Sequence, residues 1–197
     1  MNRIVILLLL IAPIMVLAES DYAAWAEANP DGAWTAIAEK AVAASRLPTV
    51  VPSDIAKFCP NYPTLRTADR SKFWVGLLSA MARPESDFQP DKTYQESFKD
   101  RRGDWVISRG LLQLSQESAN GYGCKIKNAK DLHDPSVNIP CSIRILDRWV
   151  DKDGVIASYK LDLDVRGGGR YWSVLRESAN FLPEIAAFTQ SLAFCKV

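Results

Sequence analysis

The sequence has a single histidine and four cysteines, which leaves little material for metal or nucleophile chemistry. The histidine, His133, stands beside a predicted helix start, so we interpret it as a loop residue. Ser108 and Ser115 lack the matching histidine and aspartate of a serine hydrolase. The cysteines do not have the spacing of metal ligands. We therefore expect an activity that needs no metal and no cofactor.

Net charge is also nearly absent. The chain has 24 basic and 23 acidic residues, a formal net charge of +1. A nucleic-acid-binding protein needs a basic excess or a basic stripe to neutralise phosphates. The balance excludes nucleic acid as the expected partner. The sequence also has no internal repeat and no low-complexity tract, so a repeat architecture is not expected.

Long apolar runs are missing except near the start, from Ile4 to Leu17, where Pro13 interrupts the run. A membrane-spanning helix needs about 20 apolar residues, more than this run supplies. Small and apolar residues precede Glu19, as a signal peptidase requires. We interpret residues 1–18 as a signal peptide cleaved after Ala18, leaving a secreted or periplasmic protein. No cysteine follows the cut, so no lipid or membrane anchor is expected.

The four cysteines all lie after the predicted cleavage site. An even number of cysteines in an exported chain predicts two disulfides. Three pairings are possible. We favour Cys124 with Cys141, which closes a short loop, and Cys59 with Cys195, which ties the tail to an early segment.

The remaining residues, 19–197, have the length of one domain. Their apolar spacing and turn residues predict a mostly helical protein with little sheet. The expected elements are two helices within 21–44, a short helix at about 53–58, an amphipathic helix over 71–82, a loop or small hairpin over 91–108, a helix that begins at Pro135, and a last helix over about 183–194.

Two of these helices have strong local signals. In the first, Phe73, Trp74, Leu77, Leu78 and Met81 recur at helical spacing, and Pro84 predicts a kink or an end just before Glu85. The second has Asp134 as cap and Pro135 at the first helical position. Its predicted buried side consists of Ile139, Ile143, Leu146 and Val150.

Three short motifs occur in a specific order. Glu85-Ser86-Asp87-Phe88 follows the first of these helices, Gly110-Leu111-Leu112-Gln113 comes next, and Asn138 lies near the head of the second helix. Together they resemble the soluble lytic transglycosylase family, which has E-S-x-F, then G-L-M-Q, then an asparagine at the head of the next helix. The resemblance covers residues 72–150. It implies a lysozyme-like fold, mainly α with a small β element beside the active-site cleft.

The resemblance also implies roles for single residues. Glu85 takes the position of the family's catalytic acid, Gln113 lies beside the cleft, and Asn138 supports the site; we count the last two with the substrate-binding residues. In this family one glutamate acts twice. It protonates the glycosidic oxygen, then accepts the proton of the muramyl C6 hydroxyl as that oxygen closes onto C1.

A hydrolysing lysozyme is the nearest alternative, and it commonly needs a second carboxylate to activate water. The interval between Glu85 and Gln113 contains several acidic residues, of which we favour Glu96. The flanking Tyr94 and Phe98 are predicted to form one wall of the cleft. Tyr94 is therefore grouped with the candidate substrate-binding residues, and Ser108 is counted among them as well.

The family's A-Y-N-x-G signature, whose tyrosine reaches toward the catalytic glutamate, is not present after the helix that begins at Pro135. We favour Tyr171 as its replacement, because the preceding Gly167-Gly168-Gly169 permits close backbone approach. The glycine run itself is interpreted as a flexible turn.

The sequence thus predicts an exported monomeric enzyme that cleaves the β-1,4 bond between N-acetylmuramic acid and N-acetylglucosamine in peptidoglycan. Lytic transglycosylation with Glu85 is the leading subtype, and hydrolysis with Glu85 and Glu96 is the alternative. A non-catalytic protein that binds the cell wall is the alternative of another class, because a fold does not by itself establish an activity.

Overall fold

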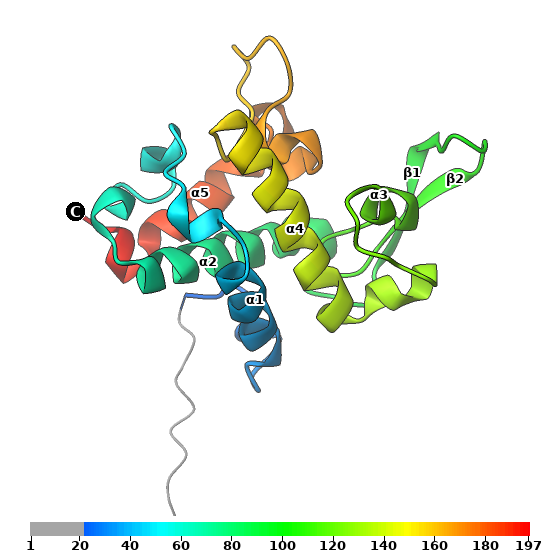
Figure 1. Cartoon of the computed structure of the whole chain (residues 1–197), viewed down its shortest axis with the longest axis horizontal. Helices are drawn as coiled ribbons and strands as arrows, with labels where there is room; N and C mark the ends of the chain where they lie inside the picture. Colours follow the sequence, from blue (N-terminus) through cyan, green and yellow to red (C-terminus); the bar gives the residue numbers. More distant parts are fainter. Residues whose placement is uncertain (1–21) are drawn as a thin grey trace, which may run out of the picture.

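The computed structural model describes residues 22–197, so the predicted signal peptide lies outside the described residues. A body of helices carries one projecting β-hairpin (Figure 1). The expectation of a mainly helical, lysozyme-like fold with a small β element is confirmed. The longer elements are α1 (Ala33–Ala43), α2 (Thr67–Ser86), β1 (Thr93–Lys99), β2 (Trp105–Arg109), α3 (Gln116–Gly121), α4 (Pro135–Asp153) and α5 (Leu182–Ser191).

Helix α2 is the centre of the core. It is longer than the predicted 71–82, and residues Phe73–Ala82 are buried around the whole helix and not along one stripe. Helices α1 and α5 both pack against it. Burying each large apolar side chain stabilises the fold by roughly 1.5–3 kcal/mol. Helix α2 continues through Pro84 and ends at Ser86. Its buried core segment is therefore a rigid support for Glu85, which lies in its last turn.

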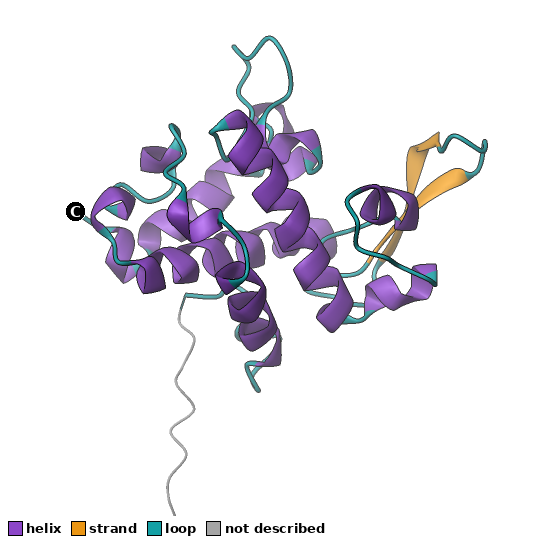
Figure 2. Cartoon of the chain, in the orientation of Figure 1, coloured by secondary structure: helices purple, strands orange, loops and turns teal. Residues whose placement is uncertain are grey.

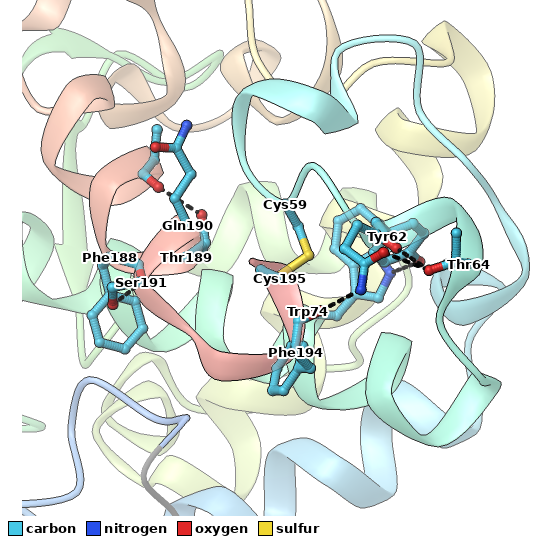
Figure 3. The surroundings of a disulfide bond; sticks show 12 residues. Cys59, Tyr62, Thr64, Trp74, Phe188, Thr189, Gln190, Ser191, Phe194 and Cys195 are labelled. Atoms are coloured by element: carbon cyan, nitrogen blue, oxygen red, sulfur yellow. Dashed lines mark hydrogen bonds between the residues drawn. A yellow bond between two sulfur atoms is a disulfide. The ribbon is translucent and has the colours of Figure 1, made fainter. Parts of the chain in front are cut away.

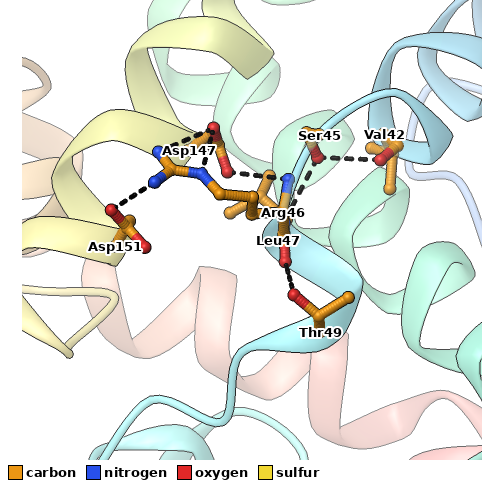
Figure 4. Close-up of polar contacts among 7 residues, drawn as sticks. All are labelled: Val42, Ser45, Arg46, Leu47, Thr49, Asp147 and Asp151. Atoms are coloured by element: carbon orange, nitrogen blue, oxygen red, sulfur yellow. Dashed lines mark hydrogen bonds and ion pairs between the residues drawn. The ribbon is translucent and has the colours of Figure 1, made fainter.

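Helix α4 begins as predicted. The Asp134 carboxylate accepts a hydrogen bond from the Ser136 amide at 2.8 Å, with Pro135 at the first helical position. The four apolar residues predicted to face the core are all buried. Helix α4 packs against α1, and Arg46, just after α1, bridges to Asp147 and Asp151 on α4 (Figure 4).

The segment before α1 differs from expectation. The prediction of two helices within 21–44 is wrong, because residues 22–31 form turns and only α1 is helical. The buried Trp25 indole donates to the Thr35 hydroxyl at 3.0 Å, and the Asn29 side chain accepts from the Trp34 amide at 2.7 Å. A segment this short cannot sustain an isolated helix, and these tertiary bonds decide its path.

Two other predicted helices are shorter than expected. The segment around 53–58 forms a single 3₁₀ turn, Ile55–Lys57. The last helix, predicted over 183–194, ends at Ser191 and is followed by the 3₁₀ turn Ala193–Cys195. No helix among residues 22–197 is long and apolar enough to cross a membrane.

Two disulfides tie the chain together in the pairing favoured from the sequence. Cys59 bonds Cys195 and anchors the tail beside the buried Tyr62–Trp74 pair (Figure 3). Cys124 bonds Cys141 and joins the segment after α3 to α4. In the chain-entropy model, closing loops of 136 and 17 residues contributes about 5 and about 3 kcal/mol to stability, respectively.

The region 91–108, predicted as a loop or small hairpin, contains the antiparallel pair β1–β2, which projects from the helices (Figure 2). Tyr94 pairs with Ser108 and Gln95 with Ile107, but Lys99 pairs with Trp105. The register shift between Gln95 and Lys99 is a bulge, a device that re-aims side chains. Glu96 lies inside this bulge.

Candidate active site

Glu85 lies in the last turn of α2 and is half-buried at a cleft of about 450 Å³. The cleft runs between the helical body and the hairpin. Of the residues proposed from the sequence, Glu96, Ser108, Gln113 and Tyr171 line it together with Glu85. Residues far apart in the chain therefore meet at one place.

The surroundings of Glu85 favour its neutral form. Burial raises the pKa of its carboxyl to about 8, and the nearby negative charge of Glu96 contributes in the same direction. A carboxylic acid with this pKa holds its proton at neutral pH. Glu85 can therefore donate a proton where an exposed glutamate would already have lost it.

Glu96 is held at the cleft by its neighbour across the hairpin. The buried Ser108 hydroxyl donates to Glu96 Oε1 at 2.6 Å. The other acidic residues between Glu85 and Gln113 do not line the cleft. Asp100 accepts hydrogen bonds from two backbone amides of the hairpin turn, and Asp91 and Asp104 are exposed and do not line the cleft.

The turn Gly110–Gln113 brings the second motif to Glu85. Gly110 has φ +76°, and a Cβ there would lie 2.1 Å from the Leu132 carbonyl oxygen, so no other residue fits without rearrangement. Ser86, the residue after Glu85, donates its buried hydroxyl to the Leu111 carbonyl oxygen at 2.9 Å. The first two motifs are thus joined directly.

Gln113 has a left-handed backbone, with φ +47°, and is 8% exposed. Its side-chain nitrogen donates to the carbonyl oxygens of Gly110 at 2.8 Å and Lys92 at 3.3 Å. Its side-chain oxygen has no hydrogen-bond partner among the described residues. This oxygen is itself buried, so Gln113 lines the cleft without exposing the acceptor.

Asn138 is fully buried and does not line the cleft, so it has no surface with which to contact a glycan. Its oxygen accepts from the Leu112 amide at 3.0 Å, and its nitrogen donates to the carbonyl oxygens of Arg109 and Leu132. Grouping Asn138 with the substrate-binding residues is corrected by this geometry. Its bonds match the supporting role that the family resemblance implies.

Tyr171 lines the cleft beside Glu85. Its hydroxyl oxygen accepts a long hydrogen bond from the Ser115 amide at 3.4 Å, and its ring packs edge-on against Tyr122. Burial raises the pKa of Tyr171 to about 12, so its hydroxyl stays protonated at neutral pH. Tyr171 thus shares the cleft with Glu85, and its role as a replacement for the signature tyrosine stays a prediction.

The glycine run before Tyr171 is not a flexible turn, and that interpretation is corrected. Gly167–Arg170 form a 3₁₀ turn whose glycines are all buried. A Cβ at Gly167 would lie 2.5 Å from the Val155 carbonyl oxygen, and one at Gly168 would lie 2.4 Å from Leu175 Cδ1. The glycines are required because this turn packs tightly, in agreement with the expected close backbone approach.

Tyr94 does not line the cleft with the other candidates. It is 58% exposed on the hairpin, whereas Phe98, two positions beyond Glu96, does line the cleft. The cleft is also lined by Arg170, Trp172 and Arg176, which were not predicted from the sequence. Trp172 donates its indole N–H to the Leu112 carbonyl oxygen at 2.9 Å. No local motif marks these residues, since their approach depends on the folding of the segment after α4.

Within residues 22–197, no group of three or more histidine, cysteine, aspartate or glutamate side chains is placed to hold a metal ion. The side chains that line the described cleft supply two carboxyl groups, an amide, hydroxyls and guanidinium groups.

Comparison with known proteins agrees with this arrangement. The family described as the transglycosylase SLT domain matches residues 64–161. The solved wild-type structure of Bd0314 DslA is 46% identical, with a TM-score of 0.83, and covers 88% of this chain and 97% of that chain. A glutamate-to-glutamine mutant of the same protein is 45% identical, with a TM-score of 0.84, and covers 89% and 98%.

A second mutant of that protein also replaces a glutamate by glutamine, 11 positions from the first in its own numbering. No curated protein sequence matches the chain. The family match includes all three motifs, and the structural relatives cover nearly the whole described fold. The chain belongs to the transglycosylase SLT domain family.

Proposed function

We propose that this protein hydrolyses the β-1,4 bond between N-acetylmuramic acid and N-acetylglucosamine in peptidoglycan, with Glu85 as general acid and Glu96 as the carboxylate that activates water. One observation carries the proposal. Glu85 and Glu96 line the same cleft, close enough for the charge of Glu96 to raise the pKa of Glu85. Most glycosidases use two carboxyl groups as catalytic residues, and the different surroundings of the two groups separate their pKa values.

In the proposed reaction, neutral Glu85 gives its proton to the bridging oxygen as the bond to C1 breaks. Positive charge develops on the sugar ring. Glu96 accepts a proton from water while the water oxygen bonds to C1. The products are a reducing end and a new free hydroxyl on the leaving sugar. The hydrogen bond from the Ser108 hydroxyl orients the Glu96 carboxylate for this proton transfer.

The relatives support this pair of residues. Glu85 and Glu96 are 11 positions apart, the same interval that separates the two glutamates replaced in the Bd0314 DslA mutants. Tyr171 and Gln113 are proposed as substrate contacts, because both line the cleft and Tyr171 carries a protonated hydroxyl there. The two disulfides support an exported protein, since they persist in oxidising compartments.

Lytic transglycosylation is the second candidate, and the family match favours it. In that reaction Glu85 acts as acid and then as base, and an anhydro ring replaces the reducing end. Glu96 would then have no essential part in catalysis. The non-catalytic alternative is less well supported, because an acid with a raised pKa in a cleft is typical of catalytic sites.

The test compares Glu85→Gln and Glu96→Gln with Glu117→Gln, an exposed control on α3. General acid catalysis contributes about 10²–10⁴-fold, so the first variant should lose that much activity on peptidoglycan, and the control should lose none. Equal activity of Glu85→Gln and the parent would end the catalytic proposal. Inactivity of the parent on every peptidoglycan tested would favour the wall-binding alternative.

Mass spectrometry of the released fragments, with digestion in ¹⁸O-water, separates the two enzyme candidates. Hydrolysis predicts reducing ends that carry one ¹⁸O atom and a strong loss of activity in Glu96→Gln. Anhydro ends without ¹⁸O, released by the parent and also by Glu96→Gln, would show that the enzyme is a lytic transglycosylase and would contradict the hydrolysis proposal.

A further inference from the structure

The cleft is lined by two arginines in addition to its two glutamates. The two arginines differ in whether a carboxylate of the protein binds them. Arg170 is neutralised, because Asp153 binds its guanidinium at 2.6 and 3.2 Å. Among residues 22–197, Arg176 has no such carboxylate partner. Its Nε donates to the Gly169 carbonyl oxygen at 2.7 Å, and its two terminal amino groups form no hydrogen bond or ion pair within residues 22–197.

Two acidic residues of the segments that meet at Arg176 are otherwise engaged: Glu177, which follows it, and Asp162, which binds the hydroxyl of Ser158, the bridge partner of Arg176. The Glu177 carboxylate accepts from the Lys160 amide at 2.9 Å, and the Asp162 carboxylate accepts from the Tyr159 amide at 2.6 Å. Arg176 is therefore the cleft-lining cation without a carboxylate among the described residues.

The fold holds Arg176 in place. Its backbone forms an isolated parallel bridge with Ser158, and its amide donates to the Ser173 carbonyl oxygen at 2.8 Å. A Cβ at Gly169 would contact Arg176 Cγ at 3.4 Å, so the buried glycine turn packs along the arginine stem. With Nε bonded to Gly169 as well, little freedom remains for the guanidinium to lose on binding. This pre-organisation favours affinity.

We propose that Arg176 binds a carboxylate group of the substrate and so makes the cleft selective for carboxylate-bearing glycan strands over neutral ones. This inference rests on the proposed function and names its substrate class more closely. A guanidinium presents parallel N–H donors that match the two oxygens of a carboxylate, and both terminal amino groups of Arg176 are available for this contact.

A peptidoglycan strand offers this chemistry from two sources. One is the lactyl group of a muramic acid residue whose peptide has been removed. The other is a carboxylate of the stem peptide where the peptide is present. A polymer of N-acetylglucosamine alone has neither. Comparing the three ligands therefore separates recognition of a carboxylate from recognition of the sugar backbone.

The experiment measures binding by calorimetry in the Glu85→Gln background, where the ligands stay intact. The ligands are tetrasaccharides of one length: neutral N-acetylglucosamine, peptide-free muramyl, and peptide-bearing muramyl. Adding Arg176→Gln should weaken binding of at least one carboxylate-bearing ligand about tenfold or more and change the neutral ligand less than about twofold. The ligand that is weakened identifies the source of the carboxylate.

Unchanged neutral-ligand binding shows that the variant is folded, and Arg66→Gln, an arginine 87% exposed at the start of α2, is the matched charge control. Equal weakening of all three ligands, no weakening of any, or no binding of carboxylate-bearing ligands would overturn the proposal. These outcomes are independent of catalysis. Failure of the parent to cleave peptidoglycan would instead count against the proposed function.

Discussion

The side-chain oxygen of Asn138 accepts a hydrogen bond from the Leu112 amide at 3.0 Å, and this single bond joins the start of α4 to the turn that carries Gln113. The nitrogen of the same side chain donates to the carbonyl oxygens of Arg109 and Leu132. The buried amide thus ties the start of α4 to the loop beside Glu85 through Leu112 and Arg109, and to the turn before α4 through Leu132.

Asn138→Asp keeps the shape of the side chain but replaces the donor by an oxygen that faces two carbonyl oxygens. Each buried group left unsatisfied costs about 1–3 kcal/mol, so we expect the free energy of unfolding to fall by about 3 kcal/mol or more. Urea denaturation measures the change. The same substitution at the exposed Asn180 is the control and should have little effect. Equal stability of Asn138→Asp and the parent would contradict the supporting role.

Glu85 is expected to destabilise the fold at neutral pH. Its pKa is raised from 4.5 to about 8 in the folded protein, so between these values the folded state holds a proton that the unfolded state has released. The free energy of unfolding therefore decreases as pH rises through this range, by about 1.4 kcal/mol per pH unit. Glu85→Gln removes the ionisation and should stabilise the protein by about 3 kcal/mol at pH 7.

Thermal unfolding of parent and Glu85→Gln from pH 4 to pH 9 measures this difference. It should vanish below about pH 4.5, where both states of the parent hold the proton, and level off above pH 8. Glu117→Gln should follow the parent throughout. A stability difference that does not depend on pH would show that the pKa of Glu85 is not raised in the folded protein.

Activity should depend on the protonated form of Glu85. Because its pKa is about 8, we expect kcat/KM to fall about tenfold per pH unit above pH 8. Glu96→Gln removes a negative charge that raises this pKa, so the titration of Glu85 should move to lower pH. It should stay above the ordinary range, because burial is the larger cause.

Carbon-13 NMR of the Glu85 carboxyl follows this titration even where the variant is inactive. A titration that does not move in Glu96→Gln would show that the two carboxyl groups do not interact across the cleft.

Ser108 is predicted to position Glu96. Ser108→Ala removes the 2.6 Å hydrogen bond and leaves Glu96 free to rotate, so we expect kcat to fall about tenfold with a smaller change in KM. Ser97→Ala, at an exposed position of the neighbouring strand β1, is the matched control and should keep full activity. Steady-state kinetics on soluble glycan fragments makes the comparison. Equal loss in both variants would indicate a general effect on the hairpin.

Helix α4 and the core segment of α2 could be predicted from the sequence, because apolar spacing and caps act within a few residues. The same local reasoning failed before α1, where Trp25 and Asn29 bond to residues of the helix that follows. The prediction of a flexible turn at the glycine run was wrong for a similar reason. The atoms that crowd Gly167 belong to Val155 and Ile156, which lie more than ten residues earlier in the chain.

The three motifs by themselves determined the family and placed Glu85, because their residue types and order are properties of the chain alone. Only the tertiary structure decided which acidic residue shares the cleft with Glu85 and that Asn138 supports the loop without lining the cleft. It also decided that Arg176 lines the cleft with no carboxylate partner in the described part of the chain. The physical reason is that a cleft is formed between segments. The hairpin bulge, the turn at Gln113 and the glycine turn meet there through packing that no single segment records.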